Sequence, residues 1–90
     1  MAEERSDEYF VGRLCGRIRL LIATSDEIPM DVKLQTQPML KDFEQSVGLP
    51  PEDQDPARAR GQYAFLCQEL EAYPDIEALL FALRNFVPYL

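Results

Sequence analysis

Ninety residues with a formal net charge of −7 and 47% apolar residues suit one small folded domain. Acids exceed bases mainly after residue 41, so non-specific binding to nucleic acid, which depends on Lys and Arg, is not expected. No apolar run approaches the roughly 20 residues that cross a membrane, and no signal-peptide pattern follows the acidic start. We therefore expect a cytoplasmic protein that contacts neither membrane nor nucleic acid directly.

The first expected element is a helix over residues 6–24, with Ser6 as its N-cap. Its core stripe consists of Phe10, Val11, Leu14, Cys15, Ile18, Leu21 and Ile22. Gly12 and Gly16 fall on the opposite side, beside Tyr9 and Leu20. A glycine inside a helix costs about 1 kcal/mol relative to alanine. Two glycines away from the core therefore predict the close approach of another helix, from this chain or from another.

Residues 28–37 allow two interpretations. Apolar and polar residues alternate there, which is typical of a short strand, but no partner strand is visible elsewhere in the chain. Pro29 suits the first turn of a helix. We predict a helix that starts near Pro29, is broken or kinked at Pro38, and ends at Gly48.

The second half begins with an acidic, proline-rich loop over residues 49–55. Asp55 is expected to cap a third helix that opens at Pro56 and ends near Tyr73. Pro74 and Asp75 are expected to form a tight break and a new cap, followed by a fourth helix over residues 76–87.

These elements predict an all-α fold, with four or five helices in one domain over residues 1–90. The arrangement is expected to be an antiparallel bundle or an orthogonal array, with residues 1–5 frayed. The apolar end, residues 86–90, is expected to dock on the domain rather than on a partner.

The residues needed for most catalytic and metal sites are missing. There is no histidine, the commonest general base and metal ligand, and two cysteines cannot complete a zinc site. The glycines form no phosphate-binding loop, and residues 52–55 lack the glycine and distal glutamate of a calcium loop. Cys15 and Cys67 are predicted to be buried thiols rather than a disulfide or redox pair. We expect no catalytic residue, metal or cofactor.

Two further helices carry an apolar residue opposite their core stripe, Phe65 on the third and Phe81 on the fourth. A 90-residue monomer would struggle to bury three such strips, and exposed apolar patches usually mark binding sites. The predicted partner-binding residues are Tyr9, Gly12, Gly16, Leu20, Phe65 and Phe81. The leading hypothesis is a non-catalytic protein–protein interaction module, an adaptor or regulator that self-associates as a homodimer or larger homo-oligomer.

Two other hypotheses remain open. In the first, the chain is an acidic inhibitor or mimic that occupies a basic groove of a nucleic-acid-handling protein. Its acidic surface would consist of Asp42, Glu44, Glu52, Asp53, Glu69 and Glu71, with Asp55, Asp75 and Glu77 nearby. In the second, Tyr63, Glu69 or Arg17 line the pocket of a small enzyme or ligand carrier, which no motif supports.

Overall fold

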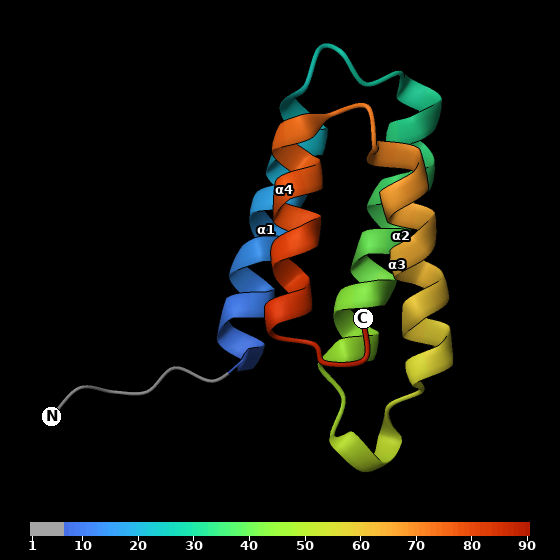
Figure 1. Cartoon of the computed structure of the whole chain (residues 1–90). Helices are drawn as coiled ribbons and strands as arrows, with labels where there is room; N and C mark the ends of the chain where they lie inside the picture. Colours follow the sequence, from blue (N-terminus) through green and yellow to red (C-terminus); the bar gives the residue numbers. More distant parts are fainter. Residues whose placement is uncertain (1–6) are drawn as a thin grey trace, which may run out of the picture.

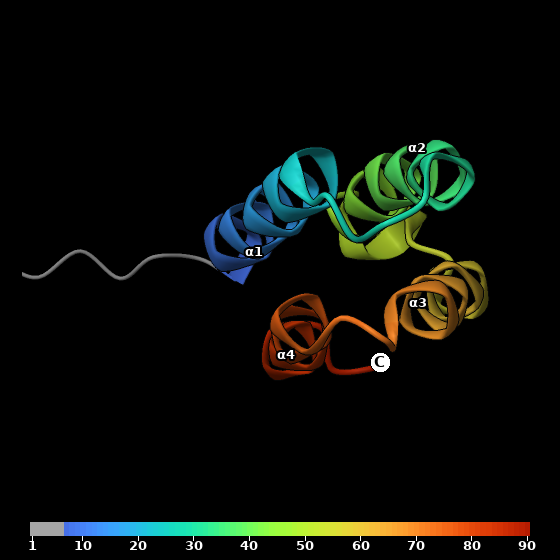
Figure 2. The same ribbon diagram turned by 90° about the horizontal axis from the view of Figure 1, so that it is seen from above.

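The computed structural model describes residues 7–90, which form four antiparallel helices in two layers (Figures 1 and 2). The helices are α1 (Asp7–Thr24), α2 (Met30–Val47), α3 (Pro56–Leu70) and α4 (Pro74–Ala82), with 3-10 turns η1 (Pro51–Asp53) and η2 (Leu83–Asn85). α1 and α2 make one layer, α3 and α4 the other, and α2 packs against both α1 and α3. The described residues contain no strand, so the predicted all-α bundle is confirmed. None of these helices is long and apolar enough to span a membrane.

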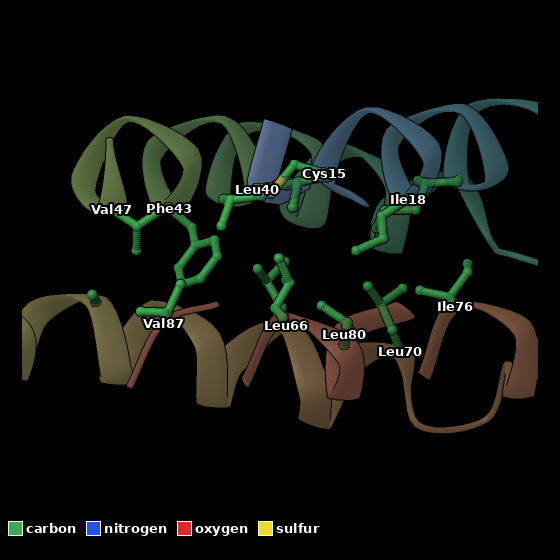
Figure 3. Close-up of a cluster of buried hydrophobic side chains, with 14 of the residues drawn as sticks. Cys15, Ile18, Leu40, Phe43, Val47, Leu66, Leu70, Ile76, Leu80 and Val87 are labelled. Atoms are coloured by element: carbon green, nitrogen blue, oxygen red, sulfur yellow. The ribbon is translucent and has the colours of Figure 1, made fainter. Parts of the chain in front are cut away.

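The core lies between the two layers, and every helix contributes to it (Figure 3). Ile18 and Leu40 enter from the first layer and meet Leu66 and Leu80 from the second, all of them at most 1% exposed. Burying one such side chain stabilises the fold by about 1.5–3 kcal/mol. One face of each helix therefore packs in the core, and the residues on its remaining faces can contact solvent or a partner.

α2 runs through Pro38 as one continuous helix, so a break there, one of the two predicted outcomes, is wrong. Pro38 lies on the exposed side of the helix, and its missing N–H affects only the carbonyl of Leu34, an exposed residue. Water can reach that side, which lowers the cost of the lost hydrogen bond. The hydroxyl of buried Thr36 also donates to the Val32 carbonyl at 2.7 Å within the preceding turn.

α3 starts where the sequence predicts but ends earlier. Asp55 Oδ1 accepts a hydrogen bond from the Arg58 N–H at 3.1 Å, which confirms the predicted cap. The helix ends at Leu70 rather than near Tyr73. The Tyr73 N–H bonds instead to the Leu70 carbonyl at 3.1 Å, which closes a turn between the two helices.

The predicted start and cap of the fourth helix are wrong. α4 begins at Pro74, two residues before the predicted start, with Tyr73 as an N-cap that makes no side-chain hydrogen bond. Asp75 therefore lies in the first turn. Proline is tolerated at the first helical position because its missing N–H would have no partner there. α4 ends at Ala82, and the chain continues as η2.

The C-terminal residues dock on the domain, as predicted. Val87 is 5% exposed, and the Tyr89 hydroxyl donates to Gln54 Oε1 at 2.7 Å. Phe86 stacks on Phe10 of α1, with ring centroids 5.1 Å apart. The end of the chain thus joins the start of α1 to the connection between α2 and α3. The predicted Ser6 cap and the predicted fraying of residues 1–5 lie outside the described residues.

Candidate interaction surfaces

The strip of Tyr9, Gly12, Gly16 and Leu20 lies on the outer side of α1, away from the core. A Cβ atom placed on either glycine would have no atom of the described chain within 4 Å. Neither glycine is therefore needed to admit a helix of the same molecule. Leu20 is 52% exposed, and the Tyr9 hydroxyl accepts a hydrogen bond from Arg13 Nη1 at 3.2 Å.

An apolar groove of about 550 Å³ lies beside this strip, between α1 and α2. Its lining residues are Arg19, Ala23, Leu34, Gln37, Pro38 and Lys41. Leu34 and Met30 of α2 are each 65% exposed, unusually high for large apolar side chains. Counting Leu20, three of the six large apolar side chains that are exposed among the described residues belong to α1 or α2, in addition to Phe10 of α1. We call the groove and the glycine strip the α1/α2 face.

Basic side chains lie on both helices of this layer, and two of them, Arg19 and Lys41, line the groove. From Tyr9 to Ser25 the chain has three arginines and no acid, and all three arginines are exposed. Arg19 Nη2 pairs with Glu44 Oε1 at 2.9 Å, which offsets one of these charges. Lys33 Nζ donates to the Ala23 carbonyl at 3.2 Å, and Lys41 stands exposed at the rim of the groove. α2 also carries three acids, Asp31, Asp42 and Glu44, so α1 and α2 together have five acids and five bases.

A second groove, of about 490 Å³, lies between α3 and α4. It is lined by Tyr63, Cys67, Pro74, Glu77, Ala78, Phe81 and Arg84. Phe81 is 64% exposed, and the Arg84 guanidinium carbon lies 5.5 Å from the centre of its ring. We call the outer side of this layer the α3/α4 face.

Tyr63 and Cys67 both line the second groove. The Tyr63 hydroxyl donates to the Leu80 carbonyl at 2.6 Å, which bridges α3 and α4. Burial raises the pKa of Tyr63, and the neighbouring Cys67 thiol adds to the rise. Burial also raises the pKa of Cys67, although Tyr63 acts in the opposite direction. Neither group is an activated nucleophile or base.

The six predicted partner-binding residues do not form one surface. Tyr9, Gly12, Gly16 and Leu20 share the α1/α2 face, whereas Phe81 belongs to the α3/α4 face. Phe65 lies on the flank of α3 turned away from α4, because it is about 160–200° around the helix from Tyr63 and Cys67. It is partly buried and stays apart from both grooves.

The acids of the predicted acidic surface are also divided. Asp42 and Glu44 lie in the last third of α2, with Glu44 paired to Arg19. Glu52 and Asp53 belong to η1 at the lower end of the bundle in Figure 1. Glu69 lies near the end of α3 and Glu71 directly after it, at the opposite end of the molecule. No single groove could contact all six.

The predicted enzyme residues do not converge either. Tyr63 and Glu69 lie on α3, and Arg17 is exposed on α1, which occupies the diagonally opposite corner of the bundle (Figure 2). Across residues 7–90, no three Cys, Asp or Glu side chains gather as a metal site would require. Both cysteines are free thiols.

The contribution of α2 to the α1/α2 face is not among the residues predicted from the sequence. The spacing of Met30 and Leu34 suits one helical turn, and Leu40 and Phe43 continue a helical stripe after Pro38. In the structure the stripe continues backward through Thr36, four residues before Leu40, which leaves Met30 and Leu34 exposed. Helical spacing places Thr36 in the same stripe as Leu40, but a threonine side chain is polar and does not by itself indicate a core position.

Comparisons with protein-family models, with curated proteins and with solved structures find no match to this chain. Any assignment of function therefore depends on the surfaces described above.

Proposed function

We propose that this chain is a non-catalytic protein–protein interaction module that self-associates through its α1/α2 face. The observation that carries the proposal is the exposure of Leu20 and Leu34 on neighbouring helices, together with two glycines of α1 at which an added Cβ would meet no described atom within 4 Å. Apolar patches of this kind are uncommon on monomers and usually mark contact surfaces. Small residues beside such a patch allow a partner helix to come close.

Gly16→Leu tests this proposal because the folded monomer has room for the new side chain. Leucine also favours helix over glycine by about 1 kcal/mol, so thermal stability should be kept or raised. Sedimentation velocity from micromolar to sub-millimolar concentration should show association of the unmodified chain and its loss in Gly16→Leu.

Gly61→Leu is the matched control. Gly61 also lies within a helix with no described atom near its Cβ position, but it is on α3, outside both grooves. This variant should associate like the unmodified chain. A strictly monomeric unmodified chain at the highest concentration would contradict the proposal.

A second candidate function is that of an acidic inhibitor. It is supported by a pocket at the end of the bundle where α1 and α3 finish. A pocket of about 340 Å³ there is lined in part by Asp26, Glu27 and Asp75, around the apolar side chains of Leu21 and Ile76. A basic protein segment is the complementary partner. Reversing Glu27 and Asp75 to lysine should weaken such a contact at low salt, and self-association should be unaffected.

A further inference from the structure

Three side chains recur at helical spacing along α4 and its continuation η2. Glu77, Phe81 and Arg84 are four and three residues apart, so they share one side of the helix. All three are exposed, and all three line the groove between α3 and α4. An exposed aromatic ring therefore lies between an acid on one side and a base on the other, and we call these three residues the α4 row.

The two charges of the α4 row have no opposite charge to pair with inside the molecule. Glu77 and Arg84 are two helical turns apart, about 10 Å along the axis, beyond the spacing at which side chains of one helix pair. Within residues 7–90 no ion pair joins either side chain to another residue. The Arg84 guanidinium carbon lies 5.5 Å from the centre of the Phe81 ring, so its N–H groups remain free to meet a carboxylate from outside.

The α4 row is complementary to a second copy of itself. When two identical helices pack antiparallel about a two-fold axis, each residue faces the one that lies equally far beyond the axis. An axis beside Phe81 places Glu77 of each copy opposite Arg84 of the other, and the two Phe81 rings meet at the centre. One contact thus pairs all four charges and covers both exposed rings. In a parallel pair each charge would instead lie beside its own equivalent, which is unfavourable.

We propose that the α3/α4 face is a second self-contact, in which two copies pack α4 against α4 in antiparallel orientation around Phe81. Phe81 is 64% exposed, and buried aromatic side chains often contribute most of the energy of an interface. The groove of about 490 Å³ offers the incoming ring the side chains of Tyr63 and Ala78. The contact goes beyond the proposed function, because α3 and α4 form the layer opposite α1 and α2 (Figure 2). A copy that uses both faces contacts two neighbours.

The contact area is small, so this association is expected to be weak. α4 and η2 together are about 18 Å long, and a strip of that length covers on the order of 400 Å², about half of the roughly 800 Å² per partner of a standard interface. α1 and α2 are longer, with 18 residues each, and give the first face more area. The second contact should therefore be the weaker one and appear only at millimolar concentration.

Charge reversal tests the contact in the Gly16→Leu background, which removes association through the α1/α2 face. Glu77→Arg and Arg84→Glu should each weaken the millimolar association about two- to thirtyfold, because the symmetry turns two pairs of opposite exposed charges into like pairs at once. Both side chains are exposed, so both variants should fold. Translational diffusion measured by NMR over a concentration series gives the association. A reductant keeps the free thiol of Cys67 from forming a disulfide between copies.

Mixing the two charge variants tests the two-fold geometry directly. Glu77→Arg has two positive charges in its row and Arg84→Glu has two negative charges, so a contact between them pairs opposite charges at both ends. An equimolar mixture should therefore associate at least as strongly as the Gly16→Leu parent. A mixture that associates no more strongly than the separate variants would overturn the antiparallel contact.

Two further variants test the anchor and the specificity of the charge effect. Phe81→Ala should abolish detectable association, because the ring lies at the centre of the contact. Glu52→Arg on η1, outside both grooves, is the control and should have no comparable effect. Full association of Phe81→Ala, or an equal loss in Glu52→Arg, would overturn the proposal.

Amide chemical shifts distinguish failure of this contact from failure of the proposed function. At millimolar concentration the contact should shift the amides of residues 77–84 in the Gly16→Leu parent, whereas the α1/α2 contact should shift those of α1 and α2 in the unmodified chain. If residues 77–84 do not shift, the second contact is wrong and the interaction module stands. If only they shift, the module has been placed on the wrong face and the second contact stands.

Discussion

Cys15 shows how the core controls the ionisation of a single side chain. It is fully buried, and this burial raises the pKa of its thiol from 9.0 to about 12; the charge of Glu44 adds to the rise and that of Arg19 opposes it. The folded protein therefore keeps a proton that the unfolded chain releases above about pH 9. Its contribution to the free energy of unfolding is complete below pH 9 and is lost as the pH rises toward 12.

Cys15→Ala should therefore flatten the dependence of stability on pH between 9 and 11. For the unmodified chain, this thiol lowers the free energy of unfolding by up to about 1.4 kcal/mol per pH unit in that window. The variant should be less stable at pH 8, because it loses buried volume, but should lose less stability as the pH rises. Urea unfolding at a series of pH values measures both effects. Parallel curves for the two proteins would contradict the prediction.

At the scale of the element, the outcome for each helix depended on how many local signals agreed. Asp55 followed by Pro56 gave both a cap and a first-turn proline, and α3 starts there. At Pro74 and Asp75 the helix could start either at the proline or after the aspartate, and in the structure it starts at Pro74. The position of Phe81 could be predicted as exposed from helical spacing alone. Phe81 lines one groove with Tyr63 and Glu77 because of the way α3 packs against α4. The residue pattern of a single helix does not predict that packing.

α2 contains a testable source of instability at Pro38. Proline inside a helix costs about 3 kcal/mol relative to alanine, partly because it leaves a carbonyl without its donor, here that of Leu34. Proline also restricts the unfolded chain, which recovers about 0.4–1 kcal/mol. Pro38→Ala should therefore raise the free energy of unfolding by about 1–3 kcal/mol in urea titrations.

The control for this prediction is Pro74→Ala. Pro74 occupies the first position of α4, where no intrahelical bond is lost, so its replacement should change stability by less than about 1 kcal/mol. A Pro38→Ala variant less stable than the unmodified chain would show that α2 is not strained at this residue.

At the scale of the whole molecule, the lower end of the bundle in Figure 1 is closed by the C-terminal residues rather than by a long helix. Gln54 links the C-terminal residues to the connection between α2 and α3. Its side-chain N–H donates to the Leu49 carbonyl at 2.7 Å, and its side-chain oxygen accepts a hydrogen bond from the Tyr89 hydroxyl. The connection between α2 and α3 is therefore ordered by a residue 35 positions later in the chain. Local sequence patterns cannot predict such a contact, although the apolar character of the last five residues predicted that they would dock.

Tyr89→Phe tests this closure with the loss of a single oxygen atom. The ring can keep its packing, so the expected cost is that of one hydrogen bond, about 0.5–1.5 kcal/mol. For a domain of this size each kcal/mol lowers the Tm by about 4–8 °C. Hydrogen exchange should accelerate at the amides of residues 49–55 more than within α1, because the lost bond acts on that connection. Tyr73→Phe is the matched control, since the Tyr73 hydroxyl has no hydrogen-bond partner among residues 7–90. Equal changes in exchange for the two variants would show that the contact between Tyr89 and Gln54 does not order the connection.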